Sequence, residues 1–160
     1  SASQAGCVTF IDHQLGSPYG AGDWRYVEGP EQTGIPSQGD QSLRSPAQLY
    51  REGLARLEEH CQRQFVTSFE ALTADQQDAL LEQMESGKVD LTSVPSDVFF
   101  KQLLVNAQEG FFADPVYGGN KDMVGWKMIG FPGARYDYRD FVNQKNQKLD
   151  IIPVSILGRI

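Results

Sequence analysis

The chain has 160 residues, 40% of them hydrophobic, which is enough for one domain with a modest core. Its net charge of −7 comes without any cluster of Lys and Arg, so it lacks the basic surface of a nucleic-acid-binding protein. An acidic surface also disfavours contact with anionic lipid, and no apolar run approaches the roughly 20 residues of a membrane-spanning helix. We therefore expect neither nucleic-acid binding nor direct membrane insertion.

The first predicted element is a short helix near the N-terminus. Cys7, Phe10, Ile11 and Leu15 recur at helical spacing, and Gly16 follows as a stop signal.

A long irregular segment, residues 17–44, comes next and is called the arm below. It is rich in Gly, Pro, Ser and Gln, and it has no sustained helical or strand periodicity. Trp24 and Tyr26 make it too aromatic for a free linker. We expect an ordered arm that lies on a surface of this molecule or of a partner.

Four further helices are predicted after the arm. Two of them begin at capping boxes, in which a Ser or Thr side chain and a Gln three residues later satisfy free backbone amides. Each predicted helix carries apolar residues at helical spacing. The expected ranges are Ser45 to about Gln64, Thr73 to Gly87, Ser96 to Phe112, and Asn120 to Gly130.

The last segment, residues 149–160, is called the tail. It is apolar and β-branched, and Pro153 interrupts it, so we expect it to be extended. No alternating strand pattern occurs elsewhere. The predicted fold class is mainly α: a single small helical domain, residues 1–160, with a long irregular N-terminal arm and an extended C-terminal tail. Both extended segments carry apolar side chains that are costly to leave in water, so we expect a partner to cover and order them.

Patterns that hold a cofactor are absent from the sequence. There is no GxGxxG fingerprint after a strand, no CxxCH and no cysteine cluster. Tyr117-Gly118-Gly119-Asn120 has no preceding strand and predicts a tight turn with Asn120 as a helix cap, instead of a phosphate loop. His13 and His60 lie among polar neighbours and are interpreted as solvated. No cofactor, metal or catalytic residue is therefore expected in this chain.

Four carboxylates gather near residue 130. A calcium site is conceivable, but no EF-hand pattern is present. We expect these side chains to cap turns and to pair with nearby cations. The acidic residues are Asp114, Asp122, Asp137 and Asp140, and the cations are Lys121, Arg135 and Arg139.

The aromatic residues of segment 109–138 have two interpretations. They form the core of a small helical domain, or they form the charge-poor centre of an interface. The residues concerned are Phe111, Phe112, Tyr117, Trp126, Phe131, Tyr136 and Tyr138.

Three motifs occur in order within this segment: FFADPVYGGN, DMVGWKMIGFPG and ARYDY. FIDHQLGSPYG and LYREGL extend the pattern upstream more loosely. In these motifs the chain resembles the gluconate 2-dehydrogenase subunit 3 family over most of its length.

The resemblance implies the non-catalytic small subunit of a periplasmic, membrane-bound dehydrogenase complex. A large FAD-containing subunit would oxidise the substrate, with gluconate as the first expectation and 2-ketogluconate or fructose next. A multihaem cytochrome c subunit would anchor the complex at the outer face of the inner membrane. The small subunit would escort the large one through twin-arginine export, after which its signal peptide is removed, and would stabilise it. The alternative is a free-standing periplasmic sugar-binding domain, with Trp24, Trp126 and Tyr117 stacking on the sugar.

The expected contact with the large subunit comprises aromatic residues and the turn that joins them. The predicted interface residues are Tyr117, Gly118, Gly119, Asn120, Trp126, Phe131, Trp24 and Tyr26.

Cys7 and Cys61 are the two cysteines of the chain. They are two buried thiols, an intrachain disulfide, or a link to the partner subunit. For the exported protein that the resemblance implies, we predict the Cys7–Cys61 disulfide, which would stabilise the fold by about 4 kcal/mol.

Overall fold

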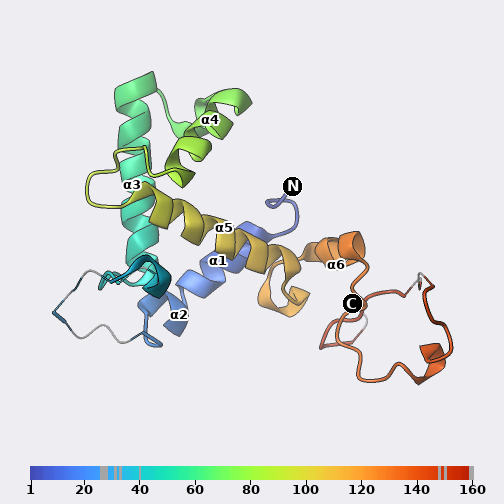
Figure 1. Cartoon of the computed structure of the whole chain (residues 1–160). Coiled ribbons are helices and arrows are strands. Elements are labelled where there is room, and N and C mark those ends of the chain that lie inside the picture. The colour runs from blue at the N-terminus through green and yellow to red at the C-terminus, as the bar shows by residue number, and fades with distance from the viewer. Residues whose placement is uncertain are drawn as a thin grey trace. The chain divides into compact units, whose positions relative to one another are not determined.

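A computed structural model describes residues 1–25, 29–30, 32, 34–39, 41–147, 149 and 151–158. It confirms the mainly helical fold class (Figure 1). Within these residues the only β-type pairings are isolated bridges, Gly133 with Val154 and Ser155 with Gly158.

The chain divides into two compact units. Unit 1 comprises residues 1–13 and 106–160, and unit 2 comprises residues 14–105. The single domain spanning residues 1–160 stays a prediction. The elements of unit 2 are α2 (Pro18–Ala21), η1 (Pro36–Gln38), α3 (Pro46–Phe65), η2 (Phe69–Ala71), α4 (Ala74–Glu85) and the first part of α5 (Ser96–Phe112).

Both predicted capping boxes are present in unit 2. The Ser45 side chain accepts from the Gln48 amide before α3, and the Gln48 side chain accepts from the Ser45 amide in return. Thr73 and Gln76 form the same pair before α4. The two helices therefore begin where the sequence predicts, because local side chains satisfy their free N-terminal amides.

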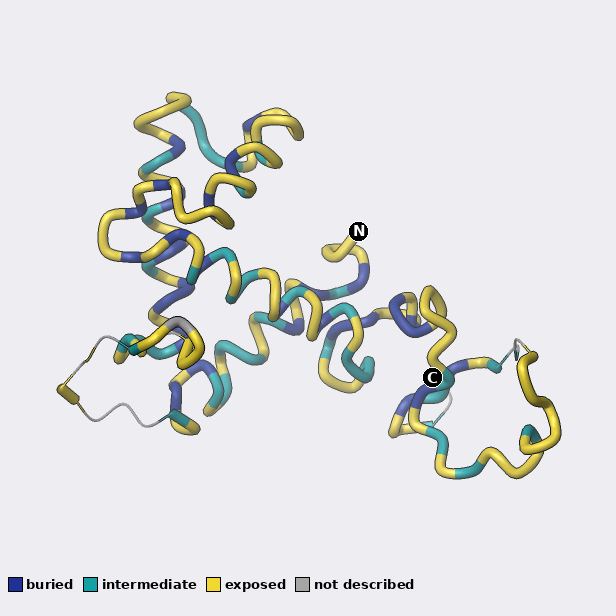
Figure 2. The backbone as a smooth tube through the Cα atoms, in the orientation of Figure 1, coloured by how far each residue is buried: buried dark blue, intermediate teal, exposed yellow. Residues whose placement is uncertain are grey.

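The core of unit 2 forms where α5 meets α3. Phe99 is fully buried, and its ring lies edge-on to Tyr50 with 6.0 Å between the ring centroids. Gly53 makes this contact possible, because a Cβ there would lie 2.6 to 2.7 Å from three atoms of the Phe99 ring. Figure 2 shows the buried positions on the inner side of α3.

We expect Gly53→Ala to destabilise the protein by about 1–3 kcal/mol, because the added methyl group overlaps a buried ring that has no room to move. The overlap outweighs the gain of about 1 kcal/mol in helix propensity. Urea denaturation measures the effect. In the double variant with Phe99→Leu the loss should be less than the sum of the two single losses, and simple additivity would contradict the contact.

The arm is tied to its own unit in the part that precedes the undescribed residues. Ser17 caps α2, and α2 packs against α3. Arg25 donates to the carbonyl oxygens of Ser42 (3.1 Å) and Arg44 (2.8 Å). The described start of the arm therefore contacts its own unit, one of the two surfaces that the sequence left open, and ordering of the arm by a partner stays a prediction.

Unit 1 contains most of α1 and the last part of α5, followed by short helices. The predicted N-terminal helix is confirmed as α1 (Cys7–Leu15). The helix expected from Asn120 begins later, as α6 after a 3₁₀ turn. The remaining elements of this unit are η3 (Pro115–Tyr117), η4 (Lys121–Met123), α6 (Val124–Ile129) and η5 (Arg139–Phe141).

The described part of the tail is extended, as predicted, but it is bound to unit 1. Val154 accepts from the Ala134 amide (2.7 Å) and donates to Pro132 (3.3 Å). Gly133 permits this close approach, because a Cβ there would lie 2.2 Å from the Val154 oxygen. Residues 151–158 thus hydrogen-bond to their own unit, and ordering of the tail by a partner stays a prediction.

Candidate functional site

The turn at residues 117–120 is organised around a buried asparagine. Asn120 is 0% exposed. Its backbone amide donates to Gly110 (2.8 Å), and its Nδ2 donates to Ala113 (2.9 Å). Its Oδ1 accepts from the amide of Gly125 (2.8 Å), in the first turn of α6. One side chain thus satisfies a free carbonyl that follows α5 and a free amide that begins α6.

The glycines around Asn120 have two separate purposes. Gly118 has φ +94°, which confirms the positive φ predicted for the turn. Gly119 and Gly125 are needed for close approach: a Cβ on either would lie 2.1 Å from a backbone oxygen, that of Gly110 or that of Phe111. The turn is therefore a packed joint within unit 1.

Trp126 is buried against this joint, at 5% exposure. Its indole Nε1 donates to the Phe112 carbonyl (2.7 Å), another free oxygen at the end of α5. The ring lies edge-on to Phe131, with centroids 5.2 Å apart. Trp126 therefore supports the surface that bears Phe131 from beneath.

The predicted interface residues do not form one surface as they stand. Tyr117, Phe131 and Trp24 are exposed, whereas Gly119, Asn120 and Trp126 are buried, and Gly118 is half-buried. Tyr26 lies outside the described residues. The interface role of these residues stays a prediction. The buried residues among them could contribute to it by holding the exposed ones in place.

Trp24 is exposed on unit 2. Its ring stacks on Tyr19 with an interplanar angle of 8°, and the guanidinium of Arg25 lies 5.8 Å from its centroid. Tyr19 in turn accepts a hydrogen bond from the side chain of Gln102 (2.9 Å) on α5. This aromatic pair belongs to unit 2, while Tyr117 and Trp126 belong to unit 1.

Apolar side chains are exposed along and after α6. We call Val124, Met128, Ile129 and Phe131 the α6 surface; Met128 is 66% exposed. Unit 1 carries seven acidic and seven basic residues and is therefore neutral. Unit 2 carries fourteen acidic and seven basic residues, so the whole net charge of −7 resides there. An apolar surface on a charge-balanced unit has the composition of an interface core.

Sequence analysis missed a second junction in unit 1, at Asp114. This carboxylate caps η3 through the Val116 amide (3.1 Å). It also accepts from the Ser155 hydroxyl (2.7 Å) and the Ile156 amide (2.8 Å) of the tail. The Asp-Pro sequence signals the cap, but nothing local signals a partner 41 residues away.

The charged form of Asp114 is what binds the tail. Burial alone would raise its pKa, but the hydrogen bonds from Ser155, Ile156 and Val116 outweigh burial and lower the pKa. The resulting stabilisation is present above the unfolded pKa of about 3.9 and is lost as the pH falls through the lower folded value.

Of the other three carboxylates, Asp137 meets the expectation of a turn cap and an ion pair. Asp137 accepts from the backbone and the side chain of Arg139. Within the described ranges, no three His, Cys, Asp or Glu side chains are grouped to bind a metal. Among the same residues, no helix is both long and apolar enough to cross a membrane.

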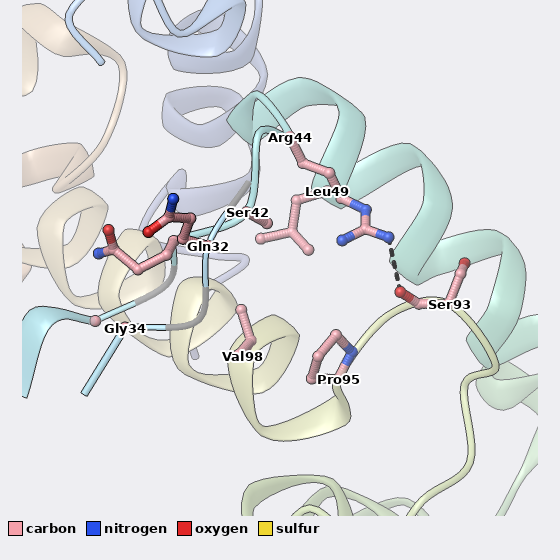
Figure 3. A pocket seen from close by; sticks show the side chains of 10 residues that line it. Gln32, Gly34, Ser42, Arg44, Leu49, Ser93, Pro95 and Val98 are labelled. Atoms are coloured by element: carbon pink, nitrogen blue, oxygen red, sulfur yellow. Dashed lines mark hydrogen bonds between the residues drawn. The ribbon is translucent and has the colours of Figure 1, made fainter. Parts of the chain in front are cut away.

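A cavity of about 640 Å³ lies in unit 2 (Figure 3). Gln32, Gln41 and Ser42 line one part, and Leu49 and Val98 line another.

Arg44 lines the same cavity, but its Nε and Nη2 are already engaged. Its Nη2 donates to the Ser93 carbonyl (2.8 Å), the bond drawn in Figure 3, and its Nε pairs with Glu52 (3.0 Å). None of the described lining residues is aromatic. The residues proposed for sugar stacking, Trp24, Trp126 and Tyr117, do not line this cavity, and the sugar-binding alternative stays a prediction.

The predicted Cys7–Cys61 disulfide is not formed: both thiols are free and buried. Cys7 belongs to unit 1 and Cys61 to unit 2, and the two residues are 2% and 0% exposed. Burial raises the pKa of both thiols, and for Cys61 the nearby Glu58 raises it further. Both cysteines therefore act as small core residues with little thiolate character.

The chain uses its most specific motifs for its own packing, and it exposes apolar side chains on a neutral unit. These two features are typical of one component in a protein assembly. Residues 1–133 match the family "Gluconate 2-dehydrogenase subunit 3", and the chain belongs to that family. It is accordingly a subunit of a multi-subunit dehydrogenase complex. Comparison with curated proteins and with solved structures finds no match.

Proposed function

We propose that this chain is the non-catalytic small subunit that stabilises and escorts a large FAD-containing dehydrogenase subunit. The observation that carries the proposal is the combination of a neutral unit 1 with the exposed α6 surface. Covering apolar surface contributes about 25 cal/mol per Å², and a neutral unit avoids the cost of desolvating unpaired charge.

Membership in the family supports the rest of the proposal. The large subunit binds FAD and oxidises gluconate in the first instance, with 2-ketogluconate or fructose as further candidates. A multihaem cytochrome c subunit accepts the electrons and anchors the complex at the periplasmic face of the inner membrane. The small subunit travels with the large one through twin-arginine export and contributes no cofactor of its own.

Co-purification tests this function. The tagged chain, co-expressed with the large subunit, is expected to elute with a yellow flavoprotein. The purified chain alone is expected to show no flavin absorption. A double variant, Met128→Asp with Ile129→Asp, should reduce the recovered flavin about tenfold or more, because two charges would be buried in the contact.

Leu54→Asp is the matched control, since Leu54 is an exposed leucine on α3 of unit 2. It should leave the recovered flavin unchanged. If the unaltered chain elutes without flavoprotein and instead binds gluconate in a calorimetric titration, the subunit function is wrong and the sugar-binding alternative holds.

A further inference from the structure

The tail ends its described part in a tight turn, residues 155–158, called the C-terminal turn here. The amide of Gly158 donates to the Ser155 carbonyl (2.9 Å), and the amide of Leu157 donates to the Ser155 hydroxyl (3.2 Å). Gly158 has φ +96°, a conformation that favours glycine. The turn is therefore closed by its own hydrogen bonds.

Anchors outside the turn fix it to unit 1. Ser155 and the Ile156 amide both bind the carboxylate of Asp114. Upstream, Arg135 donates to the Ile152 carbonyl (3.0 Å), and the Gly133–Val154 bridge holds the adjoining backbone. A short chain segment is thus held at several points along its length.

The anchored turn exposes its two apolar side chains. Pro153 and Ser155 face inward and are buried, whereas Ile156 and Leu157 are 57% and 73% exposed. These two are the central residues of the turn, and nothing described in unit 1 covers them. An apolar pair held rigidly at the tip of a turn has already lost much of the conformational freedom that binding would cost it.

Asp114 brings a second exposed pair to the same place. Its carboxylate accepts from the amides of both Val116 and Ile156, so η3 and the C-terminal turn converge on one group. Val116 and Tyr117, on η3, are exposed. The surface at Asp114 is therefore apolar on both sides of a single engaged carboxylate.

We propose that the C-terminal turn is a second docking element, which inserts Ile156 and Leu157 into an apolar pocket of the large subunit. The inference rests on the proposed function and adds a contact to it. The occupant is another subunit because the chain belongs to a family of complex subunits and unit 1 adds no net charge to the contact. A second copy of this chain is the competing occupant, and sedimentation distinguishes it in the test below.

The position of the turn in the sequence gives it a particular role. The family match ends at residue 133, and the turn lies beyond it. The α6 surface lies within the matched residues, so we expect its contact to be common to the family. The C-terminal turn provides the contact by which this chain recognises its own large subunit.

The test compares the affinity of chain variants for the purified large subunit, measured by biolayer interferometry. The double variant Ile156→Ser with Leu157→Ser should raise Kd about tenfold, as expected for losing an interface anchor. Val142→Ser is the matched control, because Val142 is an exposed apolar residue of the same unit. It should change Kd less than about twofold.

A second pair of variants tests whether the position of the turn matters for binding while its exposed side chains are kept. Gly133→Ala displaces the Val154 backbone, whereas Gly39, in unit 2, has a similar positive φ (+73° against +78°) and open space around it. We expect Gly133→Ala to weaken binding and Gly39→Ala to leave it near the wild-type value. Far-UV circular dichroism checks that the helices are retained.

Unchanged binding by the double serine variant would overturn the docking role of the turn while leaving the proposed function intact. Failure of the unaltered chain to bind the large subunit would reject both. If sedimentation shows that the unaltered chain self-associates and that the serine variant is monomeric, a second copy occupies the surface. That result would also overturn the proposal.

Discussion

Asn120→Ala should destabilise the purified chain by about 3 kcal/mol or more. The substitution leaves the Gly125 amide and the Ala113 carbonyl without their buried partner, at about 1–3 kcal/mol each. It also places alanine at φ 45°, a left-handed conformation that costs a residue with a Cβ about 1–2 kcal/mol. Urea denaturation followed by circular dichroism measures the loss.

Asn146→Ala is the control for this substitution. Asn146 also has a left-handed backbone, with φ 57°, but it is exposed. It should lose only the conformational part, about 1–2 kcal/mol. Equal losses in the two variants would mean that the hydrogen bonds of Asn120 contribute nothing measurable.

Trp126→Ala should reduce the amount of complex recovered and leave the substrate KM of the surviving complex unchanged. Removing a buried tryptophan costs about 3–5 kcal/mol of stability, and the surface that carries Phe131 loses its support. Trp126→Phe should lie between wild type and alanine, because it keeps a ring but loses the bond to Phe112. Flavin recovered per tagged chain gives the first quantity, and steady-state kinetics gives the second.

Met128→Ala is the matched truncation at an exposed site. It should leave the stability of the isolated chain nearly unchanged, and any effect on assembly then reports contact alone. A shifted KM with normal assembly in Trp126→Ala would contradict the division of labour, since it would mean that the small subunit reaches the active site.

The sequence predicts the helices well where their signals are local. Ser45 and Thr73 start their helices by bonding to residues three positions on, so a short window of sequence contains the whole cause. The aliphatic and aromatic periodicity of α5 likewise predicts its full extent, Ser96–Phe112. These elements need no information from distant residues.

The parts that the sequence does not predict depend on distant partners. Asn120 caps α6 from five residues upstream of Gly125, which is not the local capping pattern. Asp114 and Ser155 meet across 41 residues, and nothing near either one indicates the other. From the sequence, the aromatic residues of segment 109–138 fit either a core or an interface. In the structure some are buried, such as Trp126, and others are exposed, such as Phe131. Burial of single side chains depends on tertiary packing, which periodicity alone does not fix.

The free, buried cysteines affect when the protein can complete its folding. Cys7 and Cys61 occupy core positions as thiols, so the fold is complete without any oxidant. Their raised pKa keeps them protonated and slow to attack a disulfide. Folding therefore does not have to wait for an oxidising compartment. The chain can finish folding under reducing conditions, and under the function proposed above the small subunit could join its partner before export.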